Sequence, residues 1–340
     1  MNSLQIFSIR PRKGILWAFL VALTLAAAVL SLWNGSVQLS FSQVLDTLTG
    51  KDPVSTASHI VLYSRLPRTC AAMSAGLALA VAGAVIQTVL ENPLASPNVI
   101  GVNSGAGFAV ALLCAIAPTA QSYAPVAAFG GALTGVLLIN GLSRRTGASR
   151  MTVVLAGIAV SALFSAGIDA VITLVPEALN GISDFRIGGF SGVTMTGLAP
   201  AVLLILPCLL LVLSLSGQMD ILRLGKDTAR SLGLSVGAVR LILLVLSAAL
   251  AGAAVSFCGL IGFVGLIVPH TMRRLFGEES LPLLLSCALG GACFVTLCDL
   301  LSRVLFAPFE LPVGIVLAFA GAPFFLWLLF RQRGGRTWSD

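Results

Sequence analysis

Fifty-two consecutive residues, 92–143, carry no charged side chain. This run is too long for one membrane crossing, because a helix spans the bilayer with about 20 residues. Proline and polar residues at 117–125 offer a break, so the run predicts two spans, at about 98–117 and 124–142. Only 10% of the chain is charged, whereas soluble domains carry roughly 25%. The sequence therefore predicts an all-α, polytopic membrane protein.

Further apolar segments predict the remaining spans. We expect a single transmembrane domain over residues 1–340, with long spans at about 14–33, 69–90, 152–175, 198–216, 241–257, 281–300 and 313–330. The stretch 258–269 is shorter and holds three glycines. It predicts a short eighth crossing inside the protein, since irregular backbone at membrane depth is tolerated only there. We expect 176–193 to be irregular and 270–279 to be a polar loop, which leaves ten crossings in all.

The distribution of basic residues predicts the orientation. With ten crossings, both termini lie on the same side of the membrane, and fifteen of the 20 Lys and Arg residues belong to that side. Cytoplasmic loops carry an excess of Lys and Arg, so both termini are expected in the cytoplasm. The net charge of +7 is spread over short loops in this way, so it does not indicate nucleic-acid binding.

One polar segment, 219–240, interrupts the apolar pattern on the cytoplasmic side. Charged residues alternate there with apolar ones at helical spacing, and Gly225 and Gly233 divide the segment. This pattern predicts two short amphipathic helices. They would form either a handle for another protein or a solvated connecting loop.

Few residues suggest chemistry inside the membrane. Asp169 lies within the fifth span, where a carboxylate is costly; it either belongs to a transport pathway or reaches water near the outer end. His59 and His270 are expected on opposite sides of the membrane, and the seven cysteines lie in apolar runs, so no metal site is predicted. Ser104 lacks the spacing of a nucleophile turn, which disfavours an intramembrane enzyme. The chain has no P-loop, so it does not bind nucleotide in that way.

Three arginines, Arg65, Arg68 and Arg303, are expected on the outer side, where basic residues are rare. Their position suggests anionic partners, either lipid phosphate or an acidic protein surface. Without further information, lipid phosphate is the simpler interpretation.

Several short motifs occur in a specific order. They are Arg65-Leu-Pro-Arg68, Gln87 with Asn92-Pro-Leu-Ala-Ser-Pro-Asn98, Gly101-Val-Asn-Ser-Gly-Ala-Gly107, Leu224-Gly225 with Ala229, Leu232 and Gly233, Gly262-Phe-Val-Gly-Leu-Ile-Val-Pro-His270 with Arg273, Asp299 with Arg303, and Glu310-Leu-Pro312 with Gly314. Together these motifs resemble the permease subunits of ABC importers for iron chelates, haem and cobalamin. The resemblance runs from Arg65 to about Phe330, most of the chain.

The resemblance implies an assembly in the bacterial cytoplasmic (inner) membrane. Two permease subunits, identical or paralogous, would surround a central pathway lined in part by spans five and ten. Two cytoplasmic ATPases would bind ATP and Mg, with no cofactor in this chain, and a periplasmic or lipid-anchored binding protein would deliver the cargo. A ferric siderophore is the commonest cargo of the family; haem and cobalamin stay open, as does the different class of ion-coupled secondary transporter.

The resemblance also implies roles for particular residues. The loop at about 218–240 would dock in a groove of the ATPase through Leu224, Gly225, Thr228, Ala229, Leu232 and Gly233. Arg65, Arg68 and Arg303 match the arginines with which relatives meet acidic residues of the binding protein. Phe185 stands in a segment where many relatives have a tryptophan, close to the outer gate.

Overall fold

The computed structural model describes residues 9–35, 37–51, 55–98, 100–145, 150–307 and 309–333, and these form helices without strands. Seven described segments are long and apolar enough to cross a membrane. The helices within them are α1 (Ile9–Trp33), α4 (Leu66–Val89), α6 (Ala124–Arg145), α7 (Arg150–Leu174), α9 (Met195–Ser214), α12 (Val236–Cys258) and α14 (Ser280–Val304). Two shorter helices, α5 (Val102–Ile116) and α15 (Val313–Arg333), contain further apolar segments, and α13 (Val264–Phe276) is a short helix with basic residues in its last turn. The predicted all-α, polytopic class is confirmed.

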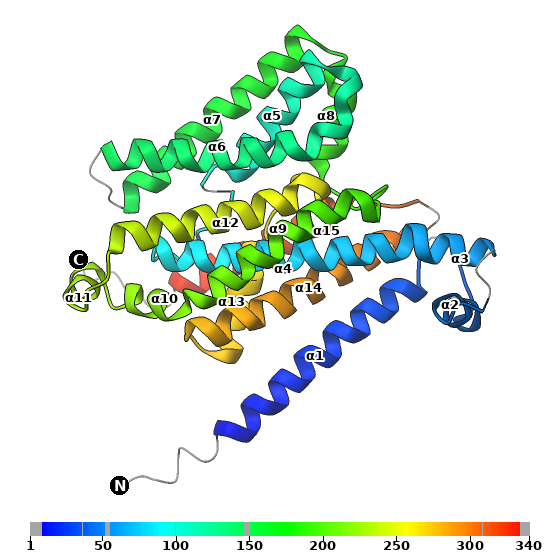
Figure 1. Cartoon of the computed structure of the whole chain (residues 1–340), viewed down its shortest axis with the longest axis horizontal. Helices are drawn as coiled ribbons and strands as arrows, with labels where there is room; N and C mark the ends of the chain where they lie inside the picture. Colours follow the sequence, from blue (N-terminus) through cyan, green and yellow to red (C-terminus); the bar gives the residue numbers. More distant parts are fainter. Residues whose placement is uncertain are drawn as a thin grey trace.

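The helices form a bundle with α4 near its centre. Helix α4 packs against α12, α13 and α14, and α12 in turn packs against α6. Helices α5–α7 and α8 (Ala178–Ile187) gather on one side of α12, whereas α1 lies along the opposite edge beside α14 (Figure 1). Short helices occupy the two ends: α10 (Ser216–Arg223) and α11 (Lys226–Ser231) at one, and α2 (Phe41–Leu48) and α3 (Thr56–Ile60) at the other. A short π-helix, η1 (Val61–Arg65), precedes α4, and a 3-10 helix, η2 (Pro118–Tyr123), precedes α6.

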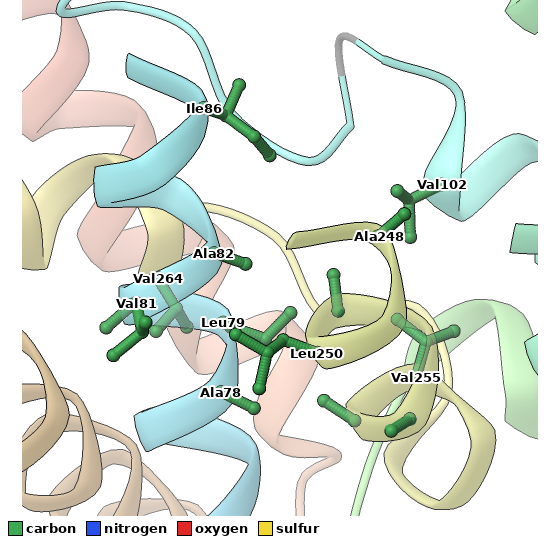
Figure 2. Close-up of a cluster of buried hydrophobic side chains, with 14 of the residues drawn as sticks. Ala78, Leu79, Val81, Ala82, Ile86, Val102, Ala248, Leu250, Val255 and Val264 are labelled. Carbon is green, nitrogen blue, oxygen red and sulfur yellow. The ribbon is translucent and has the colours of Figure 1, made fainter. Parts of the chain in front are cut away.

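Small residues bring the central helices together. A Cβ atom on Gly76 of α4 would overlap the backbone carbonyl of Gly291 in α14, and one on Gly83 would overlap that of Gly265 in α13. Figure 2 shows the adjoining core, in which Leu79 and Ala82 of α4 lie toward Leu250 of α12. Helices in lipid gain no hydrophobic drive from each other, so such close approach is a principal source of their attraction.

The eighth crossing differs from its prediction. Helix α12 continues to Cys258, residues 259–263 are irregular, and α13 begins only at Val264 and runs through the expected polar loop to Phe276. Pro269 stays inside this helix although it cannot donate to the carbonyl of Gly265. The side chain of Gln87 on α4 donates to that carbonyl instead, at 3.1 Å. The prediction was wrong because a distant side chain satisfies the backbone group that the proline leaves free.

The predicted irregular segment 176–193 contains a helix, α8. Gly181 lies within α8, and a Cβ atom there would come 2.8 Å from Sγ of Cys114 on α5. The glycine therefore permits close packing of α8 on α5 and does not break the helix. Gly188, with a φ of 74°, ends the helix as expected for a left-handed residue.

Candidate functional site

The two short helices α10 and α11 form the predicted amphipathic segment, which we call the handle (216–235). Gly225 and Gly233 have positive φ angles of 95° and 82°, so both glycines end helical turns as predicted. Met219, Leu222 and Ala229 face the protein and are buried. Leu224 and Leu232 remain 58% and 60% exposed, and Thr228 is exposed beside them. The handle therefore presents two leucines outward from a polar end of the bundle.

Polar contacts fix the handle to the start of α14. Asp220 on α10 accepts hydrogen bonds from the backbone N–H and the hydroxyl of Ser280, at 2.9 and 2.6 Å. The first N–H groups of a helix have no partner within it, so Asp220 caps α14 from outside. Arg223 forms an ion pair with Glu278 in the same turn. Asp220 and Arg223 thus tie α10 to the segment at the start of α14.

Two further contacts join neighbouring helices at this end. Arg240 near the start of α12 forms an ion pair of 3.0 Å with Glu91, just after α4. Arg273 of α13 donates to Oε1 of Gln87 on α4 at 2.6 Å. The sequence analysis did not predict the roles of Glu91, Asp220 and Glu278. A usable signal existed, because the predicted topology placed these acids on the same side as Arg223 and Arg240.

A buried ionic cluster occupies the opposite end of the bundle. Asp299 of α14 is fully buried and accepts from Nε of Arg68 at 3.0 Å. Arg303 lies one turn further along α14 and pairs with the same carboxylate at 3.2 Å. Arg68 also binds Glu310 through its NH1 group at 2.6 Å. Two guanidinium groups therefore share one buried carboxylate, and Arg68 has a second anionic partner nearer the surface.

Arg65 and Arg303 also bind the last turn of α1. Arg303 donates to the carbonyl of Ser31, and Arg65 donates to those of Leu32 and Trp33. The last carbonyls of a helix lack partners within it, and cations at this end are favourable for the helix dipole. The two arginines thus cap α1. The sequence analysis placed them at a docking surface; the structure places them in the interior, and their docking role stays a prediction.

Removal of the shared carboxylate is expected to destabilise the fold strongly. In Asp299→Asn, Arg68 and Arg303 would remain buried beside each other without their common counter-charge. We expect a loss of about 3–5 kcal/mol in the free energy of unfolding, as is typical of a broken buried pair. Denaturant unfolding in detergent measures this loss. The exposed pair Asp46–Lys51, at 3.9 Å, supplies the control: Asp46→Asn should cost no more than about 1 kcal/mol, and equal losses in the two variants would contradict the assignment.

A pocket of about 510 Å³ opens beside Arg68. Its walls are the end of α8 with residues 188–192, the end of α12 and residues 310–313 at the start of α15. Backbone hydrogen bonds join these walls: Leu260 N–H donates to Phe185 O at 2.8 Å, and Gly314 N–H donates to Gly188 O at 3.2 Å. Helix α12 rises 1.5 Å per residue, so its 23 residues span roughly 35 Å between the handle and this pocket.

Asp169 lies on α7, which packs against α5, α6 and α8. Its side chain is exposed, whereas Phe164 and Ile168 on the same helix are buried. The structure therefore does not bring it together with the arginine cluster or the handle. Among the described residues no group of three or more His, Cys, Asp or Glu side chains could hold a metal ion.

Comparison with known proteins identifies the family. The model of the FecCD transport family matches residues 23–331, most of the chain. The chain belongs to the FecCD transport family. It is a transport permease, as the motifs predicted.

Named FecCD relatives match over almost their whole length. The hemin transport system permease protein HmuU of Yersinia pestis is 38% identical over 96% of this chain and 99% of the relative. The Fe(3+)-citrate import system permease protein YfmE of Bacillus subtilis is 36% identical over 94% of this chain and 95% of the relative. A solved structure described as an inward-facing conformation of a metal-chelate type ABC transporter superposes with a TM-score of 0.82 at 30% identity, covering 94% of this chain and 99% of that one.

Proposed function

We propose that this chain is the membrane-spanning subunit of an ATP-driven importer that carries a ferric siderophore inward. The observation that carries the proposal is the handle, whose exposed Leu224 and Leu232 stand on helices tied to α14 and leading into α12. Exposed leucines at a polar end of a membrane protein indicate a partner surface more than a lipid contact. We infer that an ATPase covers them, with Gly225, Thr228, Ala229 and Gly233 shaping the contact.

The same geometry supports a mechanism of alternating access. Helices α12 and α14 run without interruption from the handle end to the pocket and the arginine cluster. Closure of the ATPase pair would push on the handle. Asp220 and Arg223 would pass this movement to α14, and the chain beyond α11 would pass it to α12. Both helices would then change the shape of the opposite end, where cargo is received.

The proposed orientation follows from the charges. We place the handle end and both termini in the cytoplasm, because that side holds most of the Lys and Arg residues. The pocket end then faces the periplasm or the exterior of a bacterial inner membrane, where Arg68 would meet a binding protein. Two ATPases would supply ATP and Mg at sites of their own. A second permease subunit would face α7, which would place Asp169 beside the pathway.

The names of the relatives indicate which chelates should be tested as cargo. Named FecCD members carry hemin or ferric citrate, and another is called a probable siderophore transport permease. We therefore propose a ferric siderophore as the first candidate cargo and haem as the second, and cobalamin would be tested as the third.

Reconstitution tests the function. The permease, its ATPase and its substrate-binding protein would be assembled in proteoliposomes, and ATP hydrolysis and uptake would be followed for each chelate. We expect one chelate-loaded binding protein to stimulate hydrolysis and to drive uptake that stops without ATP. Uptake that follows an ion gradient without ATP would establish the secondary transporter instead. Stimulation by the hemin-loaded binding protein alone, with no effect of any siderophore, would show that the cargo is haem and not a ferric siderophore.

A further inference from the structure

The pocket end contains an ionic arrangement that the proposed transport cycle does not yet use. Arg68 has two anionic partners, Asp299 through Nε and Glu310 through NH1. Arg68 and Glu310 both line the pocket, whereas Asp299 does not. The guanidinium group therefore has one side in the protein interior and one side at the pocket.

The two carboxylates differ in their freedom to move. The side chain of Asp299 is completely buried, and Arg303 holds it as well. The side chain of Glu310 is 31% exposed and belongs to the turn between α14 and α15. If the side chain of Glu310 leaves Arg68, water at the surface can solvate its carboxylate. Breaking this ion pair therefore costs little free energy. Asp299 has no such alternative, since a buried charge without its partners is costly.

The chemistry of Arg68 defines what can replace Glu310. A guanidinium fork prefers a carboxylate, which can accept two parallel hydrogen bonds. With Glu310 displaced, the three cationic side chains of Arg65, Arg68 and Arg303 lie near a single carboxylate of the described residues, that of Asp299, so the local charge favours an incoming anion. The pocket opens directly onto this position.

We propose that Glu310 is an exchangeable counter-ion, which occupies Arg68 until an acidic side chain of the delivering binding protein takes its place. This inference rests on the proposed function, because it requires a binding protein that docks at the pocket end. Glu310 then acts as an internal competitor. It weakens docking, keeps Arg68 paired in the undocked permease, and makes release of the binding protein easier after cargo transfer.

The experiment is a docking measurement on Glu310→Gln. The variant keeps the shape of the side chain and removes its charge, and Asp299 still holds Arg68 in place. The full permease in nanodiscs would be titrated with the binding protein that stimulates it in the reconstituted assay. We expect the dissociation constant to fall about fivefold, equivalent to about 1 kcal/mol, chiefly through slower dissociation.

Asp184→Asn provides the matched control. Asp184 lines the same pocket and is exposed. The carboxylates that bind Arg68 in the described structure are Asp299 and Glu310, so the loss of Asp184 alters only the general negative charge of the rim. We expect a change of less than about twofold, further reduced in 0.5 M salt because screening weakens long-range effects. Equal tightening in both variants, or no change in Glu310→Gln, overturns the exchange. Absence of docking by the unmodified permease would instead refute the proposed function itself.

Discussion

Leu232→Asp is expected to abolish copurification of the ATPase while leaving the permease folded. The side chain of Leu232 is 60% exposed in this chain, so its replacement removes little internal packing. Burial of a leucine side chain against a partner contributes about 1.5–3 kcal/mol, and a carboxylate in the same contact would have to be desolvated. The amount of ATPase retained on an affinity-tagged permease should fall at least about tenfold, with thermal unfolding in detergent unchanged.

Two variants separate the apolar contact from other effects. Leu232→Met keeps an apolar side chain of similar size and should retain the ATPase. Ser231→Asp places a charge on the neighbouring exposed position of α11 and should weaken retention less than Leu232→Asp does. Undiminished retention by Leu232→Asp would show that the handle does not form the contact. A lowered unfolding temperature in that variant alone would indicate a structural role for the leucine.

Gly76→Val is expected to prevent assembly of the central helices. A Cβ atom at this position would overlap the backbone of Gly291, and the backbone of a packed helix cannot move aside as a flexible side chain can. The helices α4 and α14 would have to separate, and the core between α4 and α12, which adjoins this contact (Figure 2), would be disturbed as well. We expect the monodisperse peak in gel filtration to disappear, whereas Gly76→Ala should give reduced yield and a lower unfolding temperature.

Gly130 on α6 provides the control for these substitutions. A Cβ atom there would meet no atom within 4 Å, and alanine is more favourable than glycine in a helix by about 1 kcal/mol. Gly130→Ala should therefore keep or raise the unfolding temperature. Normal yield and stability of Gly76→Val would show that α4 and α14 do not approach as closely as described.

The long apolar spans were predictable because each depends on local composition. The run 92–143 and the spans around it correspond to helices whose ends lie within a few residues of the prediction, and the handle has its two helices and both glycine breaks. The exceptions, α8 and α13, depend on neighbours far along the chain. Gly181 fits against Cys114, and Gln87 satisfies the carbonyl that Pro269 cannot. The sequences of α8 and α13 themselves do not indicate these contacts.

The site was predictable in its residue types but not in its connections. Arg68 and Asp299 were recognised within motifs, yet they are 231 residues apart, and nothing in either motif shows that they form a pair. The exposure of Leu224 and Leu232 followed from the docking role that the family resemblance implies. The burial of Arg65 and Arg303 could not be predicted in this way, because it depends on where the end of α1 lies relative to α4 and α14.

The capping of α1 also has a consequence for how the chain is made. Helix α1 is synthesised before its main neighbour, α14. Arg303, which donates to the carbonyl of Ser31 in the last turn of α1, follows 272 residues later. At a synthesis rate of about 5–20 residues per second, this interval lasts roughly 15–55 s. During that time α1 lies in the membrane without its last-turn cap complete. A chain truncated before Arg303 would keep the cap that Arg65 provides but would lack the one from Arg303, so its α1 would remain incompletely capped.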